Sequence, residues 1–395
     1  MRQALFTIQT SAVGLAACLA CLTPVQAKGP PKQAAYTIVP FMLQDSVSTA
    51  SGVSDLNDEG HAVGWVEWAD GNVQAVHLNL ATNLYTTLPG GSSTSAGGVN
   101  NLNQIVGKDG DFGAYWSGPW ANPVPLPPLP PAISLPAGAQ SLGVQSGALD
   151  INDSGIVIGG SSELFEIDNG DGTYSYDMVD TAVVWLVTLD SAGVNVDDPL
   201  PLLPLDGHAE SFVGTGCLNE ITGGAAQAAG YSSGPSEAVI WTIGLNQDGT
   251  LALPGPPVSL SPSTSRGNGI NNFGDACGRS NRRPFVALDG QDPETLPVPR
   301  NTQDGYADAI NDSGEIQIVG SLDIQRSRGG TIGPPQWHAY LWRNGQPIDL
   351  GVQIDSRSGW DGLRWADTIN NAGVIGGWGR FDVQHRGFLL IPNEL

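Results

Sequence analysis

The sequence has few basic residues and little cysteine. Among its 395 residues, 16 are lysine or arginine and 39 are aspartate or glutamate, so the formal net charge is −23 at pH 7. A protein that binds nucleic acid needs a basic face to neutralise phosphates, and anionic membranes likewise attract basic segments. The composition therefore argues against nucleic acid and against electrostatic membrane docking. It favours solubility outside the cell.

Helical periodicity is also lacking. No long segment repeats apolar residues every three to four positions, which argues against an enzyme of alternating strands and helices. The chain instead contains 53 glycines and 29 prolines, with 40% hydrophobic residues. This composition is typical of many short strands joined by tight turns, and it predicts an all-β fold.

The first residues resemble a secretion signal. Arg2 precedes an apolar stretch, and Val25-Gln26-Ala27 fits a small-x-small cleavage site. The apolar stretch is too short for a membrane span. We therefore expect a signal peptide at 1–27, a short linker at 28–34 and a single domain at 35–395.

A second interpretation of this terminus exists. Leu15-Ala16-Ala17-Cys18 resembles a bacterial lipoprotein box, which would leave a lipidated Cys18 at the outer membrane. The residues after Cys18 stay apolar, whereas mature lipoproteins usually begin with polar residues. Cleavage after Ala27, and an extracellular or periplasmic protein, is favoured.

One phrase recurs seven times along the chain. It consists of an aliphatic residue, Asn, a short turn usually holding Gly, an apolar run and a second Gly, as in Ile151-Asn152-Asp153-Ser154-Gly155 followed by Gly159. The repeats are about 52 residues long, and such self-similarity predicts an array of supersecondary units. We assign a structural role to the seven asparagines: Asn57, Asn100, Asn152, Asn219, Asn271, Asn311 and Asn370.

Each repeat contains enough strand-forming sequence for a small antiparallel sheet. The Asn/Gly turn joins two strands, since both residues tolerate positive φ angles. A nearly continuous apolar run, such as Thr181–Trp185, predicts a buried third strand. A segment ending in Leu-Pro predicts an outer fourth strand, where proline is tolerated; examples are Leu88-Pro89, Leu129-Pro130 and Leu253-Pro254. Four strands per repeat are typical of a propeller blade.

The two ends of the chain predict how the array closes. The seventh repeat stops at 391–395, directly after its third strand. Residues 36–40 (Tyr-Thr-Ile-Val-Pro) resemble the outer strand of the first repeat, 85–89 (Tyr-Thr-Thr-Leu-Pro). We therefore predict a seven-bladed β-propeller, closed by an N-terminal strand that completes the last blade. A linear β-solenoid is the alternative, but it would not explain this complementarity.

These motifs resemble the HAF-repeat family of extracellular bacterial proteins, named for a His-Ala-Phe run that His338-Ala339-Tyr340 approximates. The resemblance covers nearly all of the mature chain and is best in repeat six. Repeats two and four depart most, because Asn103 replaces the usual Gly in repeat two and repeat four lengthens the path to Gly230. The family has no established activity, so the resemblance implies fold and secretion, and no chemistry or cofactor.

The tryptophans divide into two groups. Four recur at one repeat position and are expected in the core: Trp116, Trp185, Trp241 and Trp342. Seven are out of phase: Trp65, Trp68, Trp120, Trp337, Trp360, Trp365 and Trp378.

Four residues near the repeat glycines are candidates for ligand binding. Trp65 and Trp378 stand at equivalent positions in repeats that closure would make neighbours, and Tyr231 and Arg279 directly follow the repeat Gly. Our hypothesis is that these residues line part of one face and stack on sugars or hold a peptide. Packing between blades is the alternative interpretation.

Other motifs carry less chemistry. Cys217 and Cys277 could form a disulfide, although two buried free thiols are an equally good interpretation. Gly230–Gly234 matches a nucleophile elbow, but it leads toward a strand rather than a helix. The segment Asp168–Tyr174 does not have the EF-hand spacing, so a hairpin tip is expected. The five histidines lack metal-ligand spacing, and no catalytic residue, metal or cofactor is predicted.

The sequence favours a secreted, monomeric, non-catalytic module that binds an unknown glycan, peptide or cell-surface protein. The alternative is an extracellular lyase or glycoside hydrolase on the propeller's central face, which would need convergent carboxylates with shifted pKa values. A structural role at a surface or in a matrix would instead require self-association.

Overall fold

The computed structural model describes residues 34–43, 48–132, 138–171, 173–252, 254–261, 264–325, 327–328, 331–332 and 336–393. Residues Ala34–Leu395 form one compact unit. The expected signal peptide, Cys18 and the linker up to residue 33 lie outside the described residues. The described part is all-β, as predicted, with one 3-10 turn, η1 (Leu350–Val352). It holds no helix long and apolar enough to cross a membrane.

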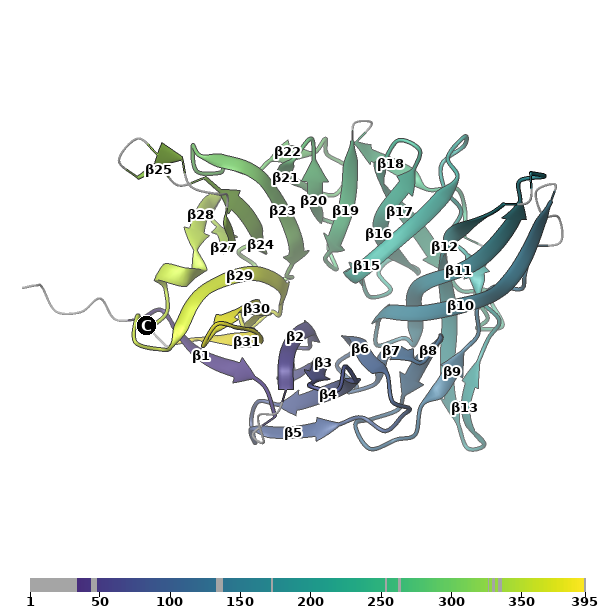
Figure 1. Cartoon of the computed structure of the whole chain (residues 1–395), viewed down its shortest axis with the longest axis horizontal. Coiled ribbons are helices and arrows are strands. Elements are labelled where there is room, and N and C mark those ends of the chain that lie inside the picture. Colours follow the sequence, from purple (N-terminus) through teal and green to yellow (C-terminus); the bar gives the residue numbers. More distant parts are fainter. Residues whose placement is uncertain are drawn as a thin grey trace, which may run out of the picture. The chain divides into compact units, whose positions relative to one another are not determined.

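Each repeat forms a small antiparallel sheet of the propeller-like kind, named here by repeat number (Figure 1). Sheet 1 contains β2 (Ser48–Leu56), β3 (His61–Trp68), β4 (Val73–Asn79) and β5 (Leu84–Thr87). Sheet 2 contains β6 (Thr94–Val99), β7 (Ile105–Asp109), β8 (Phe112–Trp116) and β9 (Val124–Leu126). Sheet 3 contains β10 (Ala139–Ile151), β11 (Ile156–Asp168), β12 (Tyr174–Asp190), β13 (Gly193–Val196) and β14 (Leu200–Pro201).

Sheets 4 to 7 continue the series. Sheet 4 contains β15 (Glu210–Leu218), β16 (Ala225–Ser233), β17 (Glu237–Gly244) and β18 (Val258–Ser261), and sheet 5 contains β19 (Ser265–Ile270), β20 (Ala276–Ser280), β21 (Arg283–Ala287) and β22 (Glu294–Thr295). Sheet 6 contains β23 (Thr302–Ile310), β24 (Gln317–Ile324), β27 (Gln336–Arg343) and β28 (Gln346–Asp349). Sheet 7 contains β29 (Trp360–Ile369), β30 (Ile375–Phe381) and β31 (Gln384–Pro392) together with β1 (Tyr36–Phe41). A separate ribbon, β25 (Ser327–Arg328) and β26 (Thr331–Ile332), lies between β24 and β27.

The first strand of each sheet lies nearest the centre of this unit in Figure 1. The core clusters combine buried side chains of neighbouring sheets. In one cluster, Ile158 of sheet 3 packs with Trp241 of sheet 4. The four tryptophans expected in the core are buried, with at most 2% of their surface exposed. Each indole N–H donates to a backbone carbonyl at 2.8 Å, the acceptors being Pro89, Pro127, Leu203 and Pro297.

The N-terminal strand lies against the last strand of the chain. β1 pairs antiparallel with β31 from Tyr36 opposite Pro392 to Phe41 opposite Gly387. A parallel bridge between Ala50 and His385 joins sheets 1 and 7. The expected pairing of the N-terminal segment with the seventh repeat is therefore present.

Two expected outer strands are misplaced. In repeat two, β9 ends at Leu126, because the backbone N–H of Leu129 leaves the ladder and donates to Ser161 Oγ of sheet 3 at 3.0 Å. In repeat four, the outer strand β18 begins only at Val258, after the Leu-Pro pair. The Leu-Pro motif therefore does not give the position of the outer strand, which ends before the motif in repeat two and begins after it in repeat four.

The repeat asparagines form a closed cycle of hydrogen bonds. Each buried side-chain Nδ2–H donates to the backbone carbonyl of the next asparagine at 2.8–3.2 Å, in the order Asn57, Asn100, Asn152, Asn219, Asn271, Asn311, Asn370 and back to Asn57. Each Oδ1 accepts a backbone N–H from its own turn, as Asn152 does from Ile156 at 3.0 Å. Asparagine is suited to this position because its amide both donates and accepts.

The second glycine of each repeat stands where the second strand crosses a bulge in the inner strand. A Cβ at these positions would lie 2.0–2.2 Å from a backbone oxygen of that strand; they are Gly64, Gly107, Gly159, Gly230, Gly278, Gly320 and Gly377. In the seventh repeat the equivalent residue is thus Gly377. The absence of a side chain is required at these positions by close backbone approach.

Candidate functional site

A small central cavity of about 160 Å³ lies at the end of the inner strands that carries the asparagine turns. A second closed cycle surrounds it: the backbone N–H of the residue after each repeat asparagine donates to a side-chain oxygen of the next repeat at 2.5–3.0 Å. The members are Asp58, Asn101, Asp153, Glu220, Asn272, Asp312 and Asn371. The four carboxylates of this cycle, Asp58, Asp153, Glu220 and Asp312, therefore accept hydrogen bonds that join neighbouring repeats.

Two deeper carboxylates also connect sheets. Asp55 accepts the backbone N–H of Val99 at 2.9 Å and the hydroxyl of Thr368 at 3.0 Å. Asp150 accepts the backbone N–H of Leu218 at 3.0 Å. Burial raises the pKa of Asp55 to about 6, and burial together with the charge of Asp55 raises the pKa of Asp150 well above its usual range. These hydrogen bonds between sheets account for the burial of Asp55 and Asp150, and no catalytic role is needed to explain it.

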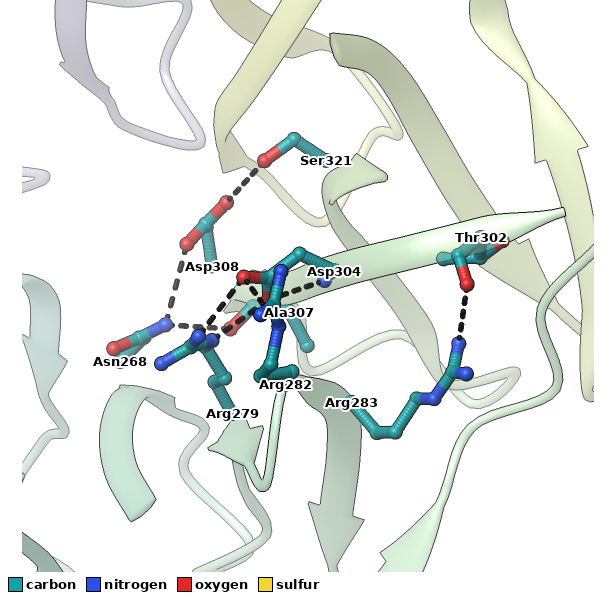
Figure 2. Close-up of polar contacts among 10 residues, drawn as sticks. Asn268, Arg279, Arg282, Arg283, Thr302, Asp304, Ala307, Asp308 and Ser321 are labelled. Atoms are coloured by element: carbon teal, nitrogen blue, oxygen red, sulfur yellow. Dashed lines mark hydrogen bonds and ion pairs between the residues drawn. The ribbon is translucent and has the colours of Figure 1, made fainter. Parts of the chain in front are cut away.

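A second pair of carboxylates, Asp308 and Asp367, belongs to the neighbouring inner strands β23 and β29. Asp308 accepts from Asn268 Nδ2 at 3.2 Å and Ser321 Oγ at 3.5 Å (Figure 2), and also from the side chain of Trp365. Burial raises the pKa of Asp308 to about 7, and burial and the charge of Asp308 raise the pKa of Asp367 well above its usual range.

The pKa of Asp308 gives a testable pH dependence. The folded protein holds the Asp308 proton up to about pH 7, whereas an unfolded aspartate releases it near pH 4, so folding binds protons in that interval. This contribution to stability is complete below about pH 4 and is lost as the pH rises through about 7. We expect Asp308→Asn to raise the melting temperature at pH 8 relative to the wild type, with a smaller gain at pH 5.

The control for this measurement is Asp361→Asn, which removes the same charge from an exposed position on β29. An equal gain in both variants would assign the effect to net charge rather than to the buried carboxyl.

Six half-buried rings form a contiguous aromatic arc across sheets 1, 7 and 6: Trp65, His385, Trp378, Trp365, Trp337 and Tyr306. Ring centroids are 5.9 Å apart for Trp65 and His385 and 4.1 Å apart for His385 and Trp378. Trp365 and Trp378 are nearly parallel, at 6° and 5.7 Å. The arc is thus built from residues that are distant in sequence but close once sheets 1 and 7 meet.

The far end of the arc is packed tightly. Trp337 and Trp365 are 4.4 Å apart, and Tyr306 lies 5.7 Å from Trp337 and 5.9 Å from Trp365. Trp365 therefore contacts rings on three strands: Trp378 on β30, Trp337 on β27 and Tyr306 on β23. All six rings keep part of their surface exposed, so the whole arc is accessible to solvent.

Arg279 contacts the arc at Tyr306 and forms an ion pair with Asp304. Its guanidinium donates to both oxygens of Asp304, at 2.9 and 3.0 Å (Figure 2). The same guanidinium lies 4.9 Å from the centre of the Tyr306 ring. Arg282 adds a contact to Asp304 at 3.3 Å. The hydrogen bonds with Asp304 raise the pKa of Arg279. Arg279 therefore contacts the ring of Tyr306 while its charge is paired with Asp304.

Tyr231 lies at a different place from the other three candidates. Its ring stacks on Phe212 at 4.7 Å and 11°, and the guanidinium of Arg266 lies 4.5 Å from the ring centre. The structure therefore joins Trp65, Trp378 and Arg279 in one chain of contacts and places Tyr231 in a separate stack.

The sequence analysis did not identify Tyr306 or His385 as candidate binding residues, and it noted Trp337 and Trp365 only as tryptophans out of phase with the repeat. A signal was present for two of these residues: Tyr306 and Trp365 each stand five positions before a repeat asparagine. Equal offsets on neighbouring inner strands place side chains at one level.

The remaining motifs are structural. Ser232 lies in strand β16, is fully buried and accepts the backbone N–H of Leu205 at 3.0 Å, so it does not stand on a strand-to-helix turn. Residues Asp168 and Tyr174 are paired at the tip of the β11–β12 hairpin, as expected. His61 Nδ1 and His77 Nε2 lie 2.8 Å apart, yet no group of three potential metal ligands occurs among the described residues.

Cys217 and Cys277 do not form a disulfide; both are free and buried. The Cys217 thiol donates instead to the backbone carbonyl of Asn268 on β19 at 2.9 Å. Burial raises the pKa of both thiols, which keeps them protonated and unreactive.

Comparison with known protein families finds no match, and no curated protein matches the chain. Solved structures similar to the chain include a puromycin-hydrolyzing peptidase of Mycobacterium tuberculosis (12% identity, TM-score 0.49), covering 91% of this chain and 55% of that one. A streptogramin B lyase matches at 13% identity and TM-score 0.40, covering 90% of this chain and 98% of the lyase. The WD40 domain of SCAP from fission yeast matches at 10% and 0.39, covering 90% and 87%.

The chain spans about half the length, 55%, of the peptidase. At these identities and TM-scores the similarities carry no argument about activity.

Proposed function

We propose that the chain is a secreted protein related to the HAF-repeat family and that it folds as a seven-bladed β-propeller closed by β1. The pairing of β1 with β31 and the cycle of hydrogen bonds from Asn370 back to Asn57 support this closure. A closed ring has no open sheet edge between the first and last repeats, which suits a monomer.

We further propose that this propeller is a non-catalytic binding module and that the aromatic arc is its ligand-binding surface. The single observation that carries the proposal is the contiguous set of half-buried rings from Trp65 to Tyr306 across three sheets. A glycan suits such a surface best among the ligands considered, because sugar rings stack on indole and their hydroxyls donate to carboxylates. Asp308, bonded to Trp365, places a carboxyl group beside the rings.

Replacing two rings tests this proposal. We expect Trp65→Ala combined with Trp378→Ala to weaken binding to any glycan found on an array by about tenfold or more, as loss of buried aromatic anchors does. Intrinsic tryptophan fluorescence during titration provides the affinity.

The matched control is Trp120→Ala, which removes a tryptophan that is 71% exposed and outside the arc. Unchanged glycan binding in the double variant, with its folding verified by circular dichroism, would contradict a binding role for the arc.

An enzyme remains the second candidate, favoured by the raised pKa values of Asp308 and Asp367. Carboxyls that retain protons near neutral pH can act as general acids in glycoside hydrolysis. Hydrolase or lyase activity that is lost in Asp308→Asn and in Asp367→Asn, each folded, would replace the binding module by an enzyme.

A further inference from the structure

Sheet 3 differs from the other sheets in the length of its strands. β10 and β11 have 13 residues each and β12 has 17, so they extend beyond the neighbouring sheets as a three-stranded hairpin sheet (Figure 1). A cavity of about 340 Å³ lies between one face of this extension and the loop that follows β9. It lies outside the aromatic arc and shares none of the arc's residues.

Strand register builds one wall of the cavity. Glu163 on β11 stands opposite Val144 on β10 and Val179 on β12, and Phe165 stands opposite Asp177. Because side chains alternate along a strand, Glu163 and Phe165 share a face with each other and with these neighbours.

Residues 129–132, which follow β9, form the other wall and are anchored to the same face of β11. The backbone N–H of Leu129 donates to Ser161 Oγ at 3.0 Å, and that of Ala132 donates to Glu163 Oε2 at 2.9 Å. Both anchors come from buried side chains, so the cavity is a built feature and not a gap between mobile surfaces.

Glu163 has an unused hydrogen-bonding capacity inside this cavity. Its side chain is only 9% exposed, and while Oε2 accepts from Ala132, Oε1 has no hydrogen-bond partner among the described residues. A buried carboxylate oxygen without a donor is costly, and a donor placed there would be strongly favoured.

The charge of the lining selects the kind of donor. Two carboxylates, Glu163 and Asp177, line the cavity, and its described lining includes no basic side chain. The rest of the wall is largely apolar and includes Leu129, Val144, Phe165, Ile167 and Val179. We propose that this cavity binds a small organic cation with an apolar body, whose protonated amine donates to Glu163 Oε1. Its volume is at the lower end of ligand sites, which range from roughly 300 to 1,000 Å³.

Phenethylamine is a suitable probe, and 2-phenylethanol is its neutral counterpart. We expect saturable binding of phenethylamine to the full mature chain in calorimetry at pH 7, at least about tenfold tighter than that of 2-phenylethanol, because a charge-assisted hydrogen bond is lost in the alcohol. Absence of saturable binding by the amine, or equal affinity of the two compounds, would overturn the proposal.

Two variants place the binding in the cavity. Glu163→Gln keeps an acceptor for Ala132 but removes the charge, and should weaken phenethylamine binding about tenfold or more. The control is Glu166→Gln, which alters a carboxylate on the other face of β11 that accepts from the Tyr176 hydroxyl. Val179→Trp fills the cavity from a residue that is 41% exposed and should abolish binding without disturbing the core.

The aromatic arc is the competing location for a cation, since ammonium groups also bind indole faces. Phenethylamine binding that survives both Glu163→Gln and Val179→Trp, or that is lost in the Trp65→Ala and Trp378→Ala double variant, would show that the cavity is not the site. Loss of glycan binding in that double variant would leave the cavity proposal unaffected.

Discussion

Gly159→Ala is expected to destabilise the protein by more than about 3 kcal/mol, whereas Gly160→Ala, one residue further along β11, should change the free energy of unfolding by less than about 1 kcal/mol. A Cβ added at Gly159 would lie 2.1 Å from the backbone oxygen of Gly147, a distance that requires the inner strand to move. A Cβ at Gly160 meets nothing within 4 Å.

Urea denaturation of the two variants and the wild type measures this difference. The pair is well matched, because both changes add one methyl group to the same strand and remove the same flexibility from the unfolded chain. Equal stabilities would mean that the bulge in β10 accommodates a side chain, and the repeated glycine would need another explanation.

Asn152→Ala should cost about 2–4 kcal/mol, since it removes a buried amide that serves several backbone groups. Asn152 Nδ2 donates to the Asn219 carbonyl at 3.0 Å, and Oδ1 accepts the N–H groups of Ser154 at 3.1 Å and Ile156 at 3.0 Å. Alanine leaves these buried groups without their side-chain partner. Asn152→Asp should also destabilise, because a carboxylate cannot donate to the Asn219 carbonyl.

The control for the asparagine variants is Asn195→Ala, which removes an exposed side chain that donates to Asp190 at 3.0 Å. Thermal and urea unfolding of Asn152→Ala and Asn195→Ala give the comparison. A loss of stability no greater than that of the control would show that the cycle of hydrogen bonds contributes little to holding the repeats together.

The position of the aromatic residues illustrates what sequence analysis could and could not find. Trp65 and Trp378 were related by equal offsets from their asparagines and by the expected closure, and the structure places both rings against His385. Tyr231 and Arg279 were chosen because they follow the repeat Gly, yet only Arg279 contacts the arc, at Tyr306, whereas Tyr231 stacks on Phe212. A repeat offset predicts the level of a side chain, but the side chains on the next sheet decide what it contacts.

The sequence by itself determined the all-β class, the inner strands of each repeat, the four core tryptophans and the pairing of the N-terminal strand with the last repeat. The first three follow from local rules, because alternation, turn residues and edge prolines act within about 50 residues. The pairing of the N-terminal strand was inferred from the complementarity of the two ends of the chain. Only the tertiary structure decided which polar and aromatic side chains meet across neighbouring sheets. It closed the asparagine cycle between residues 313 positions apart, left Cys217 and Cys277 unpaired, and turned the segment after β9 into the wall of a cavity. Such contacts depend on bulges and on the packing between sheets, and the repeat period of the sequence predicts neither.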